Sequence, residues 1–236
     1  MPDLPRAILF DLDDTLIVAG DRPLVLLEVA REFAGELEPF TPEEVADRLE
    51  AALAAFWSNP ERHKTARFGI PAARLQVFSE VFAATGALTA GLAERLAARF
   101  TVLRDELTDL FPGAVETIKT LKRQGVRLAL VTNGGTVTQR SKIERFALAP
   151  LFDHIQIEGE HAFGKPDERS YRHAMAVLGV EPGETWMVGD NLEWEVAAPQ
   201  KLGIFAIWFD GFGRGLPKDS VITPDRIIRT LPELLD

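Results

Sequence analysis

Two acidic residues stand two positions apart, directly after a short apolar segment near the start of the chain. The segment Ala7–Phe10 is too short for a helix and is followed by acidic residues, so we interpret it as a buried strand. Asp11 and Asp13 come next, and a spacing of two aims both carboxylates the same way if the strand continues. A solvated turn or a helix cap is the ordinary alternative for such a sequence.

Three more polar residues follow predicted strands later in the chain. Thr132 and Asn133 come after the predicted strand Arg127–Val131 and precede two glycines, where backbone amides can gather an anion. Asp190 follows the predicted strand Thr185–Val188. Taken alone, each of these also fits an ordinary strand-to-helix turn. Because the carboxyl ends of parallel strands converge on one edge of a sheet, we expect all of these residues to lie together.

A cation is needed if three carboxylates share that edge. Asp11, Asp13 and Asp190 would otherwise repel one another, and hard carboxylate oxygens suit Mg²⁺, which keeps several waters and is completed by a substrate phosphate. Lys165 lies in a loop whose proline begins the next helix, and its charge could neutralise a phosphoryl group, although a lone loop lysine is more often solvated. These residues indicate a Mg²⁺ cofactor and a phosphorylated substrate.

The elements that must position these residues follow two patterns. From residue 18 to residue 110 the signals are helical, with a capping box at Thr41 and Glu44 that opens a helix ending at Asn59–Pro60. Further helices are predicted at Pro71–Thr85 and Ala90–Leu107. From residue 114 on, strands and helices alternate. The predicted elements there are helix Ala114–Arg123, strand Arg127–Val131, helix Thr136–Phe146, strand His154–Ile157, helix Glu168–Leu178, strand Thr185–Val188, helix Glu193–Lys201 and strand Ile204–Phe209.

This alternation is typical of βαβ units and a parallel sheet. The strand Ala7–Phe10 has no partner near it in sequence, so the helical block is predicted to be an insertion after the first strand. We therefore predict an α/β fold, with a Rossmann-like doubly wound parallel sheet core built from residues 1–17 and 111–236. Residues 18–110 form an inserted all-helical cap domain in this prediction.

Composition excludes several classes of function. The formal net charge of −10 disfavours nucleic-acid backbones and anionic membranes as partners, so a small phosphorylated metabolite must be held by a local positive site. The chain has no cysteine, which excludes disulfides, thiolate catalysis and cysteine zinc sites. Its start is unlike a secretory signal, and no apolar stretch reaches the ~18 residues of a membrane span. We expect a cytoplasmic protein.

Together these elements resemble the four motifs of the haloacid dehalogenase-like (HAD) hydrolase superfamily. The motifs correspond, in order, to Asp11–Thr15 with the sequence DLDDT, the strand that ends in Thr132, Lys165, and Gly189–Asp190. The helical block lies where subfamily I members with a helical cap carry theirs. The chain is identified as a member of this superfamily, in its phosphatase branch.

The resemblance implies a mechanism. Asp11 attacks phosphorus to give an aspartyl-phosphate, and Asp13 protonates the leaving oxygen and then deprotonates the attacking water. Asp13 would then need a raised pKa, while Asp11 stays ionised. The implied site residues are Asp11 and Asp13 for catalysis, Thr132, Asn133 and Lys165 for the substrate phosphate, and Asp11, Asp13 (through its backbone carbonyl) and Asp190 for Mg²⁺.

One position departs from the family pattern. The fourth motif often has a second aspartate five residues after the first, and here that residue is Glu195. The longer carboxylate can reach the metal shell through water, or it can pair with Lys165.

Several alternatives stay open at this point. A phosphomutase related to β-phosphoglucomutase would share the aspartyl-phosphate, and a non-catalytic binding module would share the fold. A 2-haloacid dehalogenase needs no leaving-group acid, so the presence of Asp13 argues against it. A P-loop at Gly159–Lys165 is rejected because Pro166 replaces the hydroxyl residue that binds Mg²⁺.

Two groups of residues are assigned ordinary structural roles. The histidines are scattered in the sequence without ligand spacing, so we predict surface or core roles for His63, His154, His161 and His173. The basic segment 62–67 is interpreted as a solvated turn, with contact to the substrate's leaving group as the less common meaning.

Overall fold

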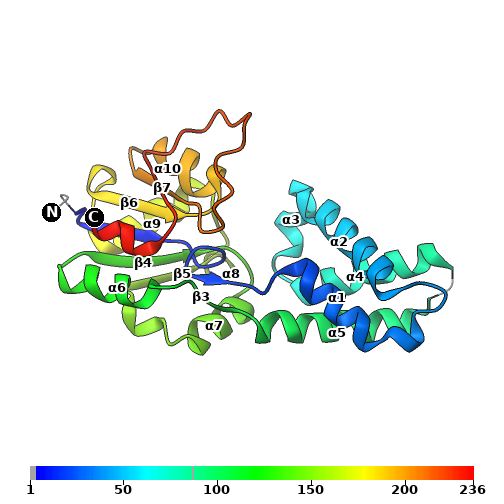
Figure 1. Ribbon diagram of the computed structural model, residues 1–236. Coiled ribbons are helices and arrows are strands. Elements are labelled where there is room, and N and C mark those ends of the chain that lie inside the picture. Colours follow the sequence, from blue (N-terminus) through cyan, green and yellow to red (C-terminus); the bar gives the residue numbers. More distant parts are fainter. Residues whose placement is uncertain (1–3, 87) are drawn as a thin grey trace. The chain divides into compact units, whose positions relative to one another are not determined.

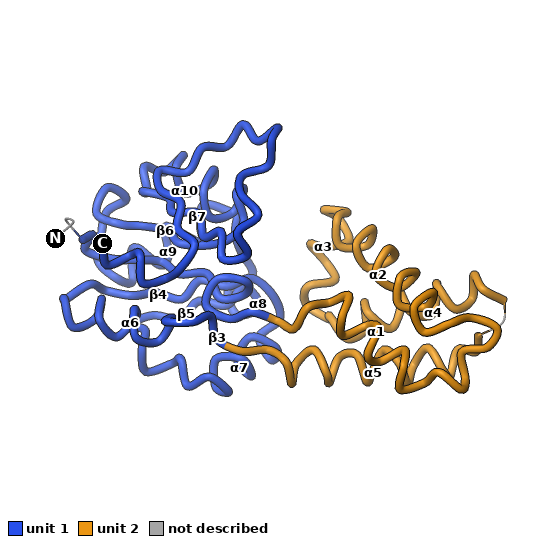
Figure 2. Tube along the Cα trace, in the orientation of Figure 1, with its two compact units in different colours: residues 1–18, 110–236 blue, residues 19–109 orange. Residues whose placement is uncertain are grey.

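A computed structural model of the chain describes residues 4–86 and 88–236 (Figure 1). The chain divides into two compact units (Figure 2). The core unit consists of the residues up to Val18 together with Leu110–Asp236, and the helical unit is Ala19–Asp109. The helical unit is thus an insertion between two parts of the core unit.

A parallel sheet with the strand order β5-β4-β1-β6-β7-β8 forms the centre of the core unit. Its strands are β1 Ala7–Phe10, β4 Arg127–Thr132, β5 His154–Ile157, β6 Thr185–Gly189, β7 Phe205–Phe209 and β8 Arg226–Ile228. The first strand of the chain therefore lies in the middle of the sheet, between β4 and β6. The predicted fold class, an α/β Rossmann-like parallel sheet, is confirmed.

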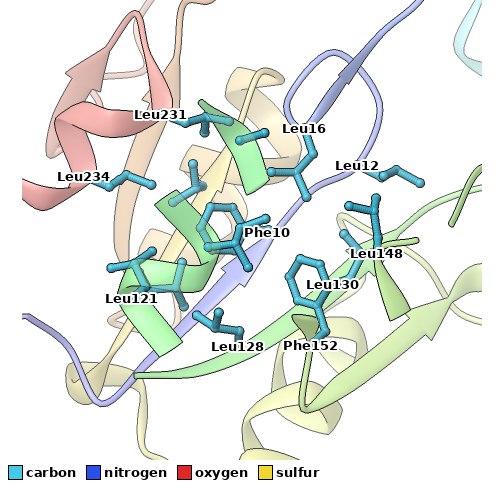
Figure 3. Packing of buried hydrophobic residues seen from close by; sticks show 14 of the residues in the cluster. Phe10, Leu12, Leu16, Leu121, Leu128, Leu130, Leu148, Phe152, Leu231 and Leu234 are labelled. Carbon is cyan, nitrogen blue, oxygen red and sulfur yellow. The ribbon is translucent and has the colours of Figure 1, made fainter. Parts of the chain in front are cut away.

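The central position of β1 explains its sequence. All four of its residues are buried, and alternate residues point to opposite faces. Ile8 and Phe10 belong to one apolar cluster (Figure 3), while Ala7 and Leu9 belong to another. A strand covered on both faces must be apolar throughout, which accounts for the uninterrupted run AILF.

Helices cover both faces of the sheet. The helical elements of the core unit are α6 Ala114–Arg123, α7 Thr136–Arg145, α8 Glu158–His161, α9 Glu168–Leu178, a π-helical turn Leu192–Ala197, α10 Ala198–Gln200, and 3₁₀ turns at Ala149–Leu151, Pro182–Glu184 and Leu231–Leu235. Buried residues of α6 and of the last 3₁₀ turn pack in the cluster with Phe10, and those of α9 pack in the cluster with Leu9. A separate two-stranded sheet pairs β2 Ile17–Val18 with β3 Asp109–Leu110.

The helical unit contains α1 Arg22–Glu32, a 3₁₀ turn Ala34–Glu36, α2 Pro42–Ser58, α3 Pro60–Ala66, α4 Ile70–Thr85 and α5 Ala90–Glu106. The predicted capping box is confirmed, because the Thr41 hydroxyl accepts from the Glu44 N–H at 3.2 Å and the Glu44 carboxylate accepts from the Thr41 N–H at 2.9 Å. Gly86 ends α4 in a left-handed conformation. No helix within residues 4–86 and 88–236 is both long and apolar enough to cross a membrane.

The interpretation of segment 62–67 as a turn is wrong for nearly all of it. Residues Pro60–Ala66 form the helix α3, because the proline that ends α2 also suits the first position of a new helix. Asn59 caps this helix, and its side-chain oxygen accepts from the N–H groups of Glu61 and Arg62, each at 3.1 Å.

Replacing Phe10 tests the importance of the central strand. The Phe10 side chain is fully buried and its ring lies edge-on to that of Phe152, with centroids 6.3 Å apart. Phe10→Ala should lower the free energy of unfolding by about 3–5 kcal/mol in denaturant titration, the usual effect of removing a buried ring. Val137→Ala, at a position 83% exposed, should change it by less than about 0.5 kcal/mol. Similar values for the two variants would contradict this packing.

Candidate active site

The carboxyl ends of three neighbouring strands bring the predicted polar residues to one edge of the sheet. β1 lies between β4 and β6, and both pairings are parallel. Asp11 directly follows β1, Thr132 ends β4, and Asp190 directly follows β6. These residues are far apart in sequence, so the sheet order is what makes them neighbours.

A buried lysine pairs with the first of these residues, Asp11. The Lys165 side chain is fully buried, and its Nζ lies 2.6 Å from Asp11 Oδ1 and 2.8 Å from Glu195 Oε1. Although burial lowers the pKa of Lys165, the two carboxylates raise it above its ordinary value, so the ammonium stays charged. Lys165 is therefore not solvated, which was the ordinary alternative for a lone loop lysine; its predicted role at the substrate phosphate stays a prediction.

The Asn133 side chain holds the lysine loop in place. Its Nδ2 donates to the Lys165 carbonyl at 2.7 Å, and its Oδ1 accepts from the Lys165 N–H at 2.8 Å. Both polar ends of the amide are thus engaged with the backbone of Lys165. We predicted phosphate binding for Asn133; its side chain instead positions Lys165, and only its backbone N–H is left for that role.

Gly164 makes this close approach possible. A Cβ there would lie 2.7 Å from Asn133 Oδ1 and 2.5 Å from Glu158 Cδ. The buried Glu158 carboxylate in turn accepts from the Gly134 N–H at 3.0 Å and ties this turn to α8. The sequence did not reveal the role of Glu158, because an acidic residue after a strand is typical of the first turn of a helix.

Glu195, the residue that departs from the family pattern, pairs with the lysine. The π-helical turn Leu192–Ala197 carries it inward, where its Oε2 accepts from the Asn191 N–H at 2.8 Å. A Cβ at Gly189 would lie 2.0 Å from Glu195 Cγ, so only glycine fits at that position. Burial and repulsion from Asp11 outweigh Lys165 and raise the pKa of Glu195 to about 7.

The site carries more negative than positive charge. Burial, together with repulsion from Glu195 and Asp11, raises the pKa of Asp190 well above its ordinary value. Burial also raises the pKa of Asp11, against the opposing effect of Lys165. Three carboxylates facing one ammonium have a formal excess of two negative charges, which a divalent cation would balance.

The donor set suits a hard cation. Among the described residues no three histidine, aspartate or glutamate side chains form a ready-made metal cage. Mg²⁺ does not require one, because it binds through one or two carboxylates and keeps waters for its other positions. Asp11 and Asp190 are carboxylates of this kind, so the residues present fit Mg²⁺.

Asp13 lies in a different environment from the one predicted. Lys142 Nζ is 2.6 Å from Asp13 Oδ1, and Gln139 Nε2 donates to Oδ2 at 2.8 Å. Partial burial raises the pKa of Asp13, but Lys142 and Gln139 outweigh it and hold the pKa below its ordinary value. The expected raised pKa of Asp13 is therefore wrong for this arrangement.

Sequence reasoning missed both partners of Asp13. Gln139 and Lys142 are three residues apart on α7 and so share one face of the helix. The Gln139 amide also donates to Thr132 Oγ1, which links the end of β4 to Asp13. The sequence signal that could have revealed them is a glutamine and a lysine three positions apart in the helix that follows the Thr132 motif.

Three of the histidines are not scattered in space. The His173 ring centroid lies 5.4 Å from that of His154 and 4.8 Å from that of His161. His173 Nδ1 is 2.8 Å from Gln156 Oε1. The three rings come from β5, α8 and α9, so only the fold brings them together, and within the described residues they form no metal-binding group.

The fold and this edge of the sheet define a hydrolase-type site, with an aspartate that pairs with a buried lysine. A family model for haloacid dehalogenase-like hydrolases matches residues 5–203. The chain belongs to this family.

Relatives with assigned activities are similar over nearly the whole chain. Phosphoserine phosphatase of Thermus thermophilus is 33% identical, with 97% of each chain covered. N-acylneuraminate-9-phosphatase of Rattus norvegicus is also 33% identical, covering 97% of this chain and 92% of that one. These relatives place the chain among the phosphatases of the family.

A solved structure shares the fold. The HAD-hydrolase YfnB from Bacillus subtilis, bound to magnesium, superimposes with a TM-score of 0.73 at 24% identity and covers 98% of this chain and 97% of that one.

Removing the Asn133 amide tests its role as a support for Lys165. Asn133→Ala leaves the N–H and carbonyl of Lys165 without these partners, so the free energy of unfolding should fall by about 1–3 kcal/mol. Gln76→Ala removes an exposed amide that donates to Glu80, and should change it by less than about 0.5 kcal/mol. Equal stability of Asn133→Ala and the native protein would refute the support role.

Proposed function

We propose that this protein is a Mg²⁺-dependent phosphatase that hydrolyses small phosphomonoesters through an aspartyl-phosphate on Asp11. The observation that carries the proposal is the buried Lys165–Asp11 pair at the carboxyl edge of the sheet, beside the acidic residues Asp190 and Glu195. The named relatives support phosphate esters as the substrate class. We expect the cytoplasm as its compartment.

Asp11 is suited to act as the nucleophile. Its Oδ1 is held by Lys165 and its Oδ2 accepts from the Thr15 hydroxyl at 3.2 Å, so the carboxylate has a fixed orientation. In the proposed first step a carboxylate oxygen forms a bond to phosphorus while the bond from phosphorus to the ester oxygen breaks. Lys165 stabilises the ionised nucleophile and the charge on the transferred group.

Asp13 supplies the proton that the leaving oxygen needs. Its carboxylate is nearly half exposed, so a bound ester can approach it. Because the contact with Lys142 keeps Asp13 ionised, Asp13 must leave this contact and take up a proton from water before it can donate that proton to the leaving oxygen. In the second step Asp13 takes a proton from water, which attacks phosphorus and releases Asp11.

Mg²⁺ would be held by the Asp11 and Asp190 carboxylates and the Asp13 backbone carbonyl, with Glu195 in reach through water. When bound it neutralises phosphoryl oxygens as a Lewis acid. Thr132 and the backbone N–H of Asn133 would bind the phosphate alongside Lys165. The helical unit Ala19–Asp109 would serve as the cap that selects the ester's organic part.

Substituting the nucleophile tests the reaction. With Mg²⁺, the native protein should release phosphate from at least one ester in a panel of sugar phosphates, phosphoglycolate, nucleoside monophosphates and sialic-acid phosphates. Asp11→Asn should lower turnover by about 10³-fold or more, because an amide does not attack phosphorus. Chelation of the metal should have a similar effect.

Asp47→Asn is the matched control, since Asp47 is exposed on α2 and should leave turnover unchanged. Transfer of phosphate between sugar positions without release would favour the phosphomutase, and halide release from a 2-haloacid would favour the dehalogenase. A protein that does neither, and that is indifferent to Asp11→Asn, would be a binding module.

Proton release should accompany Mg²⁺ binding. Because the pKa of Glu195 is raised to about 7, this carboxyl group is partly protonated below neutrality and should lose its proton as the cation binds. The pKa of Asp190 is raised in the same direction. Affinity for Mg²⁺ should therefore rise as the pH increases toward about 7. Calorimetry in buffers of different ionisation enthalpy measures the number of protons released.

Glu195→Gln should release fewer protons than the native protein, whereas Glu28→Gln, at an exposed position on α1, should match it. An affinity independent of pH in this range would show that these carboxylates do not face the cation.

A further inference from the structure

The single tyrosine of the chain, Tyr171, contacts the turn that carries Glu195. Its side chain lies in the first turns of α9 and is fully buried in the apolar cluster that contains Leu9. Its hydroxyl donates to the backbone carbonyl of Trp194. Packing in an apolar cluster would be served as well by phenylalanine, whereas a buried hydroxyl needs a partner. The apolar cluster therefore does not explain why the residue is a tyrosine.

The carbonyl that accepts from Tyr171 belongs to the π-helical turn Leu192–Ala197. The Ala198 N–H donates to the Glu193 carbonyl, five residues back, which is the π-helical pattern. One position further on, the same pattern would bring the N–H of residue 199 to the Trp194 carbonyl, but residue 199 is a proline and has no N–H. The Tyr171 hydroxyl is a donor to this carbonyl from outside the turn.

The hydroxyl thereby favours the π-helical register over the α-helical one. Without it, the Ala198 N–H would donate to the Trp194 carbonyl, four residues back, as in an α-helix. The two registers differ by one residue, which turns the side chains of this segment by about 100° relative to the helix that follows. Glu195 lies in the turn, so its carboxylate would move away from Lys165. Burial and the charge of Glu195 raise the pKa of Tyr171, so the hydroxyl keeps its proton and remains a donor.

Tyr171 also connects the turn to the segment that carries the lysine. Helix α9 begins three residues after Lys165 and is capped by Asp167. Through the Tyr171 hydroxyl, this helix holds the turn that carries Glu195, and Glu195 in turn pairs with Lys165 at 2.8 Å. The lysine and its glutamate partner are therefore positioned by one closed set of contacts.

A different side chain holds the aspartate of the same segment. Trp208 on β7 donates its Nε1–H to the Asp190 carbonyl at 2.6 Å. Asp190 keeps this contact when the Tyr171 hydroxyl is removed. An effect of that removal on the acidic site can thus be assigned to Glu195.

We propose that Tyr171 is a positioning residue, whose hydroxyl keeps the turn Leu192–Ala197 in π-helical register and so holds the Glu195 carboxylate against Lys165. If Glu195 leaves the site, the negative charge there falls by one, and the attraction for a divalent cation falls with it. The effect on Mg²⁺ rests on the proposed function, whereas the placement of Glu195 does not.

Crystal structures of the native protein and of Tyr171→Phe test the register directly. Phenylalanine fills the same space, so the variant should fold. The Ala198 N–H should donate to the Glu193 carbonyl in the native protein and to the Trp194 carbonyl in the variant. The Glu195 carboxylate should then lie away from Lys165 in the variant only.

Thr185→Val is the matched control. The buried Thr185 hydroxyl also donates to a backbone carbonyl, that of Glu181 at 2.9 Å, but it lies at the start of β6, at the opposite end of that strand from Asp190. This variant should keep the native register of the turn.

The second measurement is the affinity for Mg²⁺, by calorimetry on the full-length protein at about pH 8, where Glu195 is ionised. Tyr171→Phe should raise the Kd by at least about tenfold, because the site loses one negative charge. Thr185→Val should keep the native Kd even where its Tm is lower. A hydroxyl that is merely structural would lower the Tm of both variants and change neither Kd.

The outcomes separate this inference from the proposed function. A native register in Tyr171→Phe overturns the inference, whatever the stability of the variant. A changed register with an unchanged Kd supports the placement of Glu195 by Tyr171 and overturns its link to the cation. If the native protein binds no Mg²⁺, the proposed Mg²⁺-dependent phosphatase fails, and the two crystal structures still decide the role of Tyr171.

Discussion

The ammonium of Lys165, buried between two carboxylates, is the interaction on which the rest of the site depends. A charge removed from water must be paired, and that pairing comes from Asp11, directly after β1, and from Glu195 in the π-helical turn after β6. Each neighbouring feature serves this arrangement. Asn133 fixes the lysine backbone, and Gly189 leaves room for the Glu195 side chain. The fold thus positions one buried ammonium group against several carboxylates.

The same arrangement gives Asp11 and Asp13, the two aspartates of the first motif, different chemical environments. Asp11 faces the buried lysine, whereas Asp13 faces Lys142 at the more exposed side. Both are therefore paired with a lysine in the absence of ligand, but only the partner of Asp11 is inaccessible to water. A difference in burial, rather than in residue type, distinguishes a fixed nucleophile from a proton donor that must change partners.

Many features of the fold and the site could be predicted because each one depends on a short stretch of sequence. Strand β1, the capping box at Thr41 and the polar residues at strand ends are each written in a few consecutive positions. The sequence could not predict the contact between Lys165 and Asp11 as such, because these residues are more than a hundred positions apart. The contact of Lys142 with Asp13 and the grouping of the histidines depend on how α7, α8 and α9 pack, which local periodicity does not contain.

The pairing of β2 with β3 has a consequence for how such a chain is assembled. The segments that enter and leave the helical unit are hydrogen-bonded neighbours, and the Phe111 N–H donates to the Leu16 carbonyl at 2.9 Å. Closing a long loop costs entropy, but an insertion whose ends already meet removes most of that cost from the domain that hosts it. The helical unit can thus be lengthened, shortened or exchanged during evolution while the host sheet keeps its register, which lets one reaction centre acquire new substrates.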